Sequence, residues 1–271
     1  MTLTELRQSP HLSASGISDY LDCGLLYRFG KIDKLKPEFK PESLEFGTVM
    51  HLVMAEIHQA EMIGEELSIK AIHESFENHW TKIAKDRTDI KYAEGKSFES
   101  CLLEGKELLN TFHHKKPQND YQIVGVEEPF IFHLPGLPIP IIGAMDLLEE
   151  DESGVLIISD LKTASRAYSL DEVDRNFQMT LYQIAAKANG YADKEIILRF
   201  DCLVKTKTPK FEQYYTTRSE LDERKAVRKI IEVYKGIEAE VFIPNDSPSN
   251  WKCKGCSYKK SCEAWFLQEA A

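Results

Sequence analysis

Residues Gly143–Thr163 read GAMDLLEEDESGVLIISDLKT and carry the clearest structural signal in the chain. An apolar run over about 139–148 and a β-branched, apolar run over 155–161 predict two β-strands. Residues 152–154, Glu-Ser-Gly, supply the turn chemistry that joins two antiparallel strands. The stretch therefore predicts a β-hairpin centred on Ser153.

Three charged side chains stand on this apolar hairpin. Folding it about Ser153 places Asp146 opposite Asp160, and alternation along a strand points Asp160 and Lys162 to the same face. Charges on a buried strand are costly unless they are paired or bind metal. Two carboxylates suit Mg²⁺ or Mn²⁺, and the ammonium group can polarise a phosphate or orient a water. A surface hairpin with an ordinary Asp–Lys ion pair is the alternative.

The spacing D-x13-D-x-K resembles the core motif of the PD-(D/E)xK nuclease superfamily, with Asp in the second acidic position. The resemblance implies an α/β fold with a mixed central sheet flanked by helices, as in restriction endonucleases. It also implies a metal-dependent nuclease with Asp146, Asp160 and Lys162 as catalytic residues. His51 and the carbonyl of Leu161 would complete the protein's set of metal ligands.

The chain has no composition shift that marks a linker, and we expect a single nuclease domain over residues 1–271. Within it, a helical insertion is expected at about 43–118 and a catalytic core at about 119–217. A cysteine segment, 250–265, is expected to be stapled to the N-terminal helix, which is predicted at 13–29.

Composition fits a globular protein, with 42% hydrophobic and 29% charged residues. No apolar run approaches the ~20 residues that span a bilayer, and the N-terminal residues do not resemble a signal peptide. We therefore expect a cytoplasmic protein with no membrane association. The net charge of -10 argues against a general nucleic-acid-coating protein. A metal-dependent nuclease can still be acidic, because its carboxylates hold the cations that meet the phosphates.

Six cysteines occur, and the last three form C-x2-C-x5-C at Cys253, Cys256 and Cys262. Close spacing in a cytoplasmic protein indicates metal more often than a disulfide. Three thiolates need a fourth ligand, for which Cys23 is the best candidate. Cys101 and Cys202 are expected to be buried as small apolar side chains.

The set of Cys23, Cys253, Cys256 and Cys262 resembles the iron–sulfur staple of RecB-like and CRISPR-associated four-cysteine exonucleases. That resemblance implies a [4Fe-4S] cluster joining the two ends of the chain. Thiolates also bind Zn²⁺, so a structural zinc ion is the alternative occupant.

The segment 44–62, LEFGTVMHLVMAEIHQAEM, predicts a helix that carries Gly47 and His51. It fits the G-x-x-x-H motif of relatives in which the histidine is a metal ligand; a hydrogen-bonded core histidine is the alternative. Two amphipathic helices are predicted within 66–116. Five further histidines are expected to be exposed: His58, His73, His79, His113 and His114.

A helix predicted from Ser169 to Ala188 contains Gln178 and Tyr182, which share a face because they are four residues apart. They fit the Q-h-x-x-Y pattern of the same relatives, whose face looks onto the active site; a buried tyrosine is the alternative. Glu127 or Glu128, on a strand predicted at 121–132, matches an acidic position of these relatives, either as a ligand or in a salt bridge.

Two further strands are predicted at 195–204 and 211–216, and a long charged helix at 219–239. The densest basic stretch, 205–210, forms either a phosphate-contacting rim or a solvated turn. The resemblance implies an exonuclease on single-stranded DNA, in recombination and repair or in CRISPR spacer acquisition. Helicase or CRISPR-integration proteins are the implied partners. A non-catalytic nucleic-acid-binding or assembly module that retains the fold and cluster is the alternative.

Overall fold

The computed structural model describes residues 2–117 and 119–267 and is built on a five-stranded sheet. The strand order is β3–β4–β5–β6–β7, with β5 and β6 parallel and the other neighbours antiparallel. The mixed α/β sheet predicted from the sequence is therefore confirmed. The strands are β3 (Gln122–Phe132), β4 (Ile141–Glu150), β5 (Leu156–Ala164), β6 (Ile196–Val204) and β7 (Lys210–Thr216), with a separate parallel pair, β1 (Lys40–Pro41) and β2 (Ile90–Lys91).

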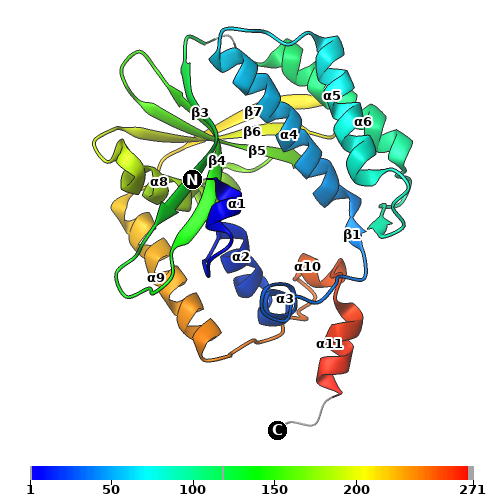
Figure 1. Ribbon diagram of the computed structural model, residues 1–271, viewed down its shortest axis with the longest axis vertical. Coiled ribbons are helices and arrows are strands. Elements are labelled where there is room, and N and C mark those ends of the chain that lie inside the picture. Colours follow the sequence, from blue (N-terminus) through cyan, green and yellow to red (C-terminus); the bar gives the residue numbers. More distant parts are fainter. Residues whose placement is uncertain (1, 118, 268–271) are drawn as a thin grey trace.

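Helices cover both faces of the sheet (Figure 1). One face packs against α4 (Glu42–Met62), α5 (Ile69–Ala84) and α6 (Phe98–Lys115). The other packs against α2 (Ala14–Asp22), α8 (Phe177–Ala186) and α9 (Glu220–Glu238). No described helix is long and apolar enough to cross a bilayer. The remaining helices are short: α1 (Leu3–Leu6), α3 (Gly24–Tyr27), η1 (Arg28–Ile32), α7 (Leu170–Asp174), η2 (Lys187–Tyr191), α10 (Trp251–Lys254) and α11 (Lys259–Phe266).

The central strands send alternate side chains into two apolar cores. Ile158 and Phe200 pack under α8 and α9, whereas Leu161 and Leu203 pack under α4, α5 and α6. Strands that are covered on both faces are apolar throughout rather than alternating with polar residues, which explains the almost continuous apolar run of β5. Cys101 and Cys202 are 1% and 0% exposed, so their assignment as buried side chains is confirmed.

The predicted hairpin forms with the predicted register. Leu147 pairs with Ser159, which centres the turn on Ser153. The Asp151 carboxylate accepts hydrogen bonds from the backbone N–H groups of Ser153 and Val155, both at 2.9 Å. Gly154 has φ +83°, a conformation that glycine adopts without steric cost. The first strand begins and ends two residues later than predicted.

Two helices predicted to be continuous are broken. The N-terminal helix is interrupted at Cys23, whose backbone is extended, with φ -166° and ψ 114°. The helix expected at 169–188 is interrupted after α7. Asn176 begins a new helix because its side chain accepts a hydrogen bond from the Met179 N–H at 3.1 Å, as an N-cap does.

The N-terminal helices lie against the segment that follows α9. The Gly24 N–H donates to the Ile243 carbonyl at 2.8 Å, and the Tyr20 hydroxyl donates to the Val241 carbonyl at 2.5 Å. Lys252 forms an ion pair with Asp22 at 2.7 Å. These contacts bring residues more than 200 positions apart into one layer, seen in Figure 1 as the blue α3 and red α10 at the same end.

We predict that Gly24→Ala destabilises the protein by about 1–3 kcal/mol, the usual cost of overpacking. A Cβ at this position would lie 2.6 Å from the Ile243 nitrogen, so the two segments must separate. Gly47→Ala is the matched control, since its Cβ meets nothing within 4 Å and should gain about 0.5–1 kcal/mol in helix propensity. Urea unfolding measures both, and equal midpoints for Gly24→Ala and the wild type would refute the close contact.

Candidate active site

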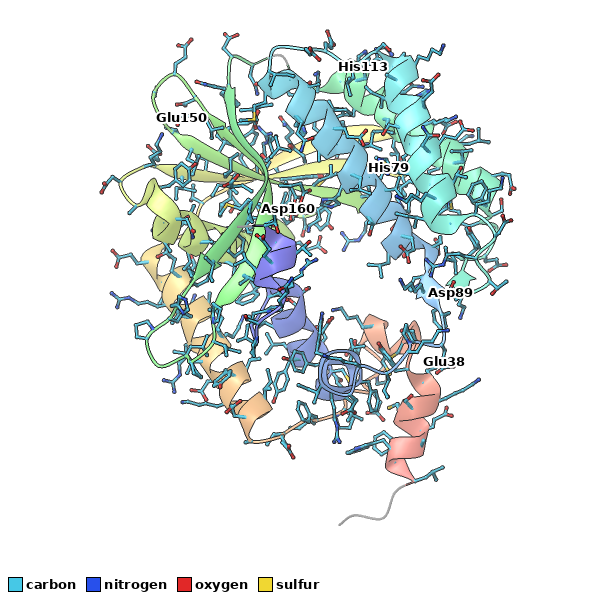
Figure 2. The ribbon with its side chains drawn as sticks, in the orientation of Figure 1. Glu38, His79, Asp89, His113, Glu150 and Asp160 are labelled. Carbon is cyan, nitrogen blue, oxygen red and sulfur yellow. The ribbon has the colours of Figure 1, made fainter. Side chains whose placement is uncertain are left out.

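The candidate site lies where β4 and β5 separate. Their pairing ends at Leu147 and Ser159; beyond it β4 pairs with β3 and β5 pairs with β6. The Leu161 N–H donates instead to the Asp146 carboxylate at 2.8 Å. The two strands thus form a fork, and Figure 2 shows Asp160 near the centre of the molecule.

Three side chains from three elements converge on the α4 side of the fork. Potential ligand atoms of His51, Glu127 and Asp146 all lie within 4.8 Å of one another. His51 Nδ1 is 3.3 Å from Asp146 Oδ2 and 3.9 Å from Glu127 Oε1. A nitrogen and two carboxylates at this separation form a donor set that fits a divalent cation.

Glu127 reaches this position through an unusual backbone. Its φ is +49°, in the left-handed region. In the β3–β4 ladder Val126 pairs with Leu147 and Glu128 pairs with Met145, so Glu127 lies opposite Asp146. A non-glycine residue in this region costs roughly 1–2 kcal/mol. The sequence left Glu127 and Glu128 as alternatives, and the structure brings Glu127 to His51 and Asp146.

Four side chains form a closed ring on the α8 side of the fork. Lys162 Nζ lies 2.6 Å from Asp160 Oδ2 and donates to Gln178 Oε1 at 3.0 Å. The Gln178 amide donates to the Tyr182 hydroxyl at 2.8 Å, and that hydroxyl donates to Asp160 Oδ1 at 3.4 Å. The ring fixes the lysine ammonium beside the carboxylate, and Asp160 is only 1% exposed.

The site concentrates negative charge in a poorly solvated place. Burial, then the charge of Asp160, raise the pKa of Asp146 well above its usual value; the same two causes raise the pKa of Glu127. Burial lowers the pKa of His51, which favours the neutral ring that binds metals. Burial also lowers the pKa of Lys162, but attraction to Asp160 more than offsets it, so the net pKa is raised.

The sequence-predicted residues therefore meet at one place, with one difference in grouping. His51 and Asp146 converge with Glu127, whereas Asp160 lies in the ring with Lys162, Gln178 and Tyr182. Leu161 lies between the two groups, because its N–H donates to Asp146 and it follows Asp160 on β5.

Comparison with known proteins identifies the family. The model of the PD-(D/E)XK nuclease superfamily matches residues 11–263. The chain belongs to this superfamily.

One of the similar solved structures agrees at the level of the fold. A "putative exonuclease" from Eubacterium rectale shares 13% identity and superimposes with a TM-score of 0.58, over 90% of this chain and 87% of that one. A second structure, SSO0001, shares 15% identity over 92% and 95% of the two chains, with a TM-score of 0.39. None of the curated proteins compared matches the chain.

This PD-(D/E)XK nuclease also gathers four cysteines at the joined ends of the chain. Burial, followed by the neighbouring thiols of Cys23, Cys256 and Cys253, raises the pKa of Cys262. All four thiols thus lie within electrostatic range of one another. Among the described residues, no three cysteine sulfurs lie within 4.8 Å of one another. A tetrahedral zinc ion with Zn–S bonds of ~2.3 Å needs sulfurs ~3.8 Å apart.

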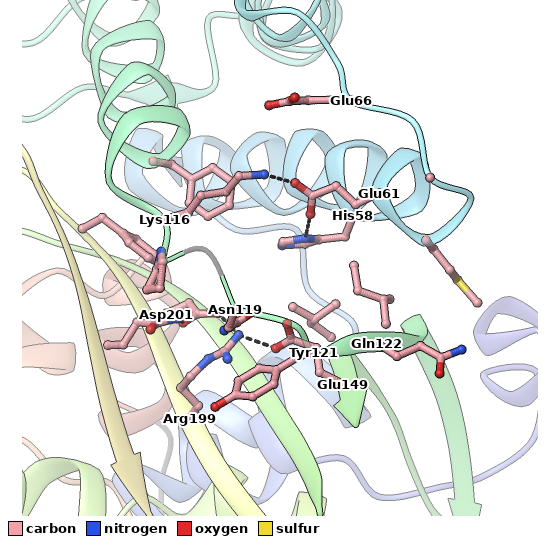
Figure 3. Close-up of a pocket in the computed structure, with 18 of the residues that line it drawn as sticks. His58, Glu61, Glu66, Lys116, Asn119, Tyr121, Gln122, Glu149, Arg199 and Asp201 are labelled. Atoms are coloured by element: carbon pink, nitrogen blue, oxygen red, sulfur yellow. Dashed lines mark hydrogen bonds and ion pairs between the residues drawn. The ribbon is translucent and has the colours of Figure 1, made fainter. Parts of the chain in front are cut away.

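A cavity of about 490 Å³ adjoins the site between the ends of α4 and α6 (Figure 3). His58 and Lys116 pair with Glu61 on one wall. Arg199 on the sheet lies 2.6 Å from Glu149 and 2.9 Å from Asp201. The expectation of exposed histidines was wrong for His58, whose side chain is 12% exposed and lies 3.0 Å from Glu61. It was also wrong for His73, His79 and His113, which are partly buried, and is confirmed for His114.

We predict that Asp146→Asn raises the melting temperature of the metal-free protein at pH 8, and that this gain shrinks towards pH 4. A raised carboxyl pKa means that the folded state binds more protons than the unfolded state, so stability falls as pH rises through the folded pKa. The amide removes that loss. Mn²⁺ should raise the melting temperature of the wild type and not of the variant. A gain independent of pH, or equal Mn²⁺ effects, would contradict the charge arrangement.

Proposed function

We propose that this protein is a metal-dependent deoxyribonuclease that hydrolyses phosphodiester bonds as an exonuclease on single-stranded DNA. The observation that carries the proposal is the convergence of His51, Glu127 and Asp146 beside the Asp160–Lys162 ion pair. The exonuclease activity and the DNA substrate are supported by the sequence resemblance and by the name of the similar structure.

The residues present fit a bound Mg²⁺ or Mn²⁺. His51, Glu127 and Asp146 would hold the cation, with Asp160 and the Leu161 carbonyl as further oxygen donors. When bound, it would lower the pKa of a water molecule and stabilise charge on the phosphate. Mutual repulsion among the carboxylates is relieved by any cation placed between them, which also favours binding.

The protein's own groups would act on the phosphate from the other side. Lys162 stays protonated because Asp160 raises its pKa, so its ammonium can neutralise charge that develops on the phosphate or orient the attacking water. Gln178 and Tyr182 contact the reacting groups only through Lys162 and Asp160. They act by holding those two side chains in place.

Asp160→Asn should abolish cleavage of end-labelled single-stranded DNA in Mg²⁺ or Mn²⁺, because it removes a carboxylate from both the ion pair and the metal site.

Lys162→Ala should lower turnover by about 100-fold or more, the loss typical for one electrostatic donor, while Mn²⁺ affinity remains.

Glu74→Gln, on the exposed surface of α5, is the control and should cleave as the wild type does. Cleavage by Asp160→Asn, or wild-type protein that binds DNA and never cleaves it, would favour the non-catalytic module. Cleavage that persists in EDTA would refute a metal-dependent reaction.

We also propose that Cys23, Cys253, Cys256 and Cys262 hold a [4Fe-4S] cluster, with the helicase- or CRISPR-associated roles that the sequence resemblance implies. The four cysteines lie near one another at the joined ends of the chain, which supports a group that all four share. Thiolate ligands and burial are the features that hold such clusters.

Protein purified without oxygen should absorb near ~400 nm and contain about four irons per chain. Cys256→Ala should lose the colour and unfold more readily, whereas Cys202→Ala, which removes a thiol buried in the sheet, should keep the colour. If the protein is colourless and contains about one zinc per chain, the four cysteines hold a structural zinc ion and not an iron–sulfur cluster. Colour that survives Cys23→Ala would exclude Cys23 as the fourth ligand.

A further inference from the structure

Two buried arginines have opposite surroundings. Arg199 is 3% exposed and pairs with Glu149 and Asp201. Arg218 is 8% exposed, and within the described chain no carboxylate lies at ion-pair distance from it. Its five N–H groups donate instead to neutral oxygens, namely the Thr180 and Thr216 hydroxyls and the carbonyls of Val173, Asn176 and Thr217. Its hydrogen bonds are complete, but its charge is not neutralised.

The pKa values reflect this difference. Burial lowers the pKa of both guanidinium groups. For Arg199 the neighbouring Asp201 and Glu149 more than reverse the effect, so its pKa is raised. For Arg218 the more distant Asp222 and Asp174 do not, and its pKa stays lowered. Arg218 is therefore attracted by these two carboxylates without being paired to either.

A cavity of about 550 Å³ lies over Arg218, where α8 and α9 both begin. Its floor is buried and its rim is exposed and basic, with Arg175, Lys225 and Lys229. Two carboxylates also line it, and both are engaged: Asp174 accepts from the Thr216 hydroxyl at 2.7 Å, and Asp222 caps α9. Two of the four cations are paired, Arg175 with Asp171 at 2.7 Å and Lys225 with Asp222 at 3.8 Å. The charges of Arg218 and Lys229, beside two positive helix ends, favour an anion.

The basic surface continues along α9. A second groove, of about 660 Å³, shares Lys225 and Lys229 with the cavity and adds Arg224 and Arg228. Glu232 also lines this groove and pairs with Arg228 at 3.0 Å, and Arg224 pairs with Glu220 at 3.5 Å. Cations on successive helical turns suit an anion with regularly spaced charges better than a single small ion. The groove floor includes Leu21 and other apolar side chains, which can contact sugars and bases.

This surface lies close to the candidate active site. Phe177 lines the cavity, and the next residue, Gln178, bonds Lys162. The two places are therefore on adjoining faces of α8, which is about 10–12 Å across.

We propose that the Arg218 cavity and the basic surface of α9 hold backbone phosphates of the DNA strand that enters the active site. The inference rests on the proposed nuclease function and adds the path of its substrate. It differs from the rim expected at 205–210: Lys205 Nζ lies 4.0 Å from the centre of the Phe46 ring, and burial lowers its pKa.

The test compares two double variants with equal changes in net charge. Lys225→Gln/Lys229→Gln removes two exposed cations from the proposed strand path. Lys70→Gln/Lys82→Gln removes two exposed cations from α5, on the opposite side of the sheet. Binding of fluorescein-labelled single-stranded DNA is measured in EDTA at several salt concentrations, so that no cleavage is required.

The α9 variant should bind about tenfold more weakly at low salt, and its slope of log affinity against log salt should be shallower by about 1. The α5 variant should match the wild type within about twofold. In Mn²⁺ the α9 variant should show a raised KM with an unchanged kcat.

Equal losses in the two variants, or no loss in either, would overturn the proposal. A third result would also overturn the proposal: inorganic phosphate stabilises the wild type, but the α9 variant binds DNA as tightly as the wild type does. The cavity would then bind a small anion and not a DNA strand. Wild-type protein that binds DNA through α9 and does not cleave in Mn²⁺ would refute the nuclease function alone.

Discussion

One hydrogen bond decides the character of this site. At the end of the β4–β5 ladder the Leu161 N–H bonds a carboxylate of Asp146 rather than a backbone carbonyl. A ladder that continued would have closed the sheet between the two acidic residues. Because it stops, backbone and side chains from both faces can reach the same point, so α4 supplies His51 and α8 supplies Gln178 and Tyr182.

The arrangement separates two electrostatic tasks. On one side, two carboxylates with raised pKa values stand beside a neutral imidazole, and a cation or a proton between them lowers the energy. On the other side, Lys162 is held protonated against Asp160 and positioned by an amide and a phenol. Asp160 contributes to both, since its charge raises the pKa of Asp146 and of Lys162 alike. Charge balance therefore couples the two halves of the site.

Much of this was predictable from local sequence. The turn at Ser153 set the hairpin register, and spacing put Gln178 and Tyr182 on one face of a helix. The break at Cys23 was not predictable from periodicity, because the segment that contacts it follows α9, more than 200 residues later. The break at Asn176 has a local cause, an N-cap, which a periodic apolar pattern conceals. Glu127 could not be chosen over Glu128, because the alternation of apolar and polar residues along the strand does not predict which residue has a positive φ. The cationic groove of α9 was missed because its arginines and lysines alternate in sequence with acidic residues, and only the fold places them beside Arg175 and Arg218.

The closure of the chain ends has a consequence for synthesis. Asn245, which donates its N–H to the sulfur of Cys23, lies 222 residues after it. At about 5–20 residues per second, translation separates these two positions by roughly 10–45 s. During that interval the Cys23 thiol has neither its backbone partner nor the other three thiols, while the hairpin and β6 are already made. The nascent chain is thus expected to pass through a stage with a formed sheet and an unshielded, oxidisable sulfur.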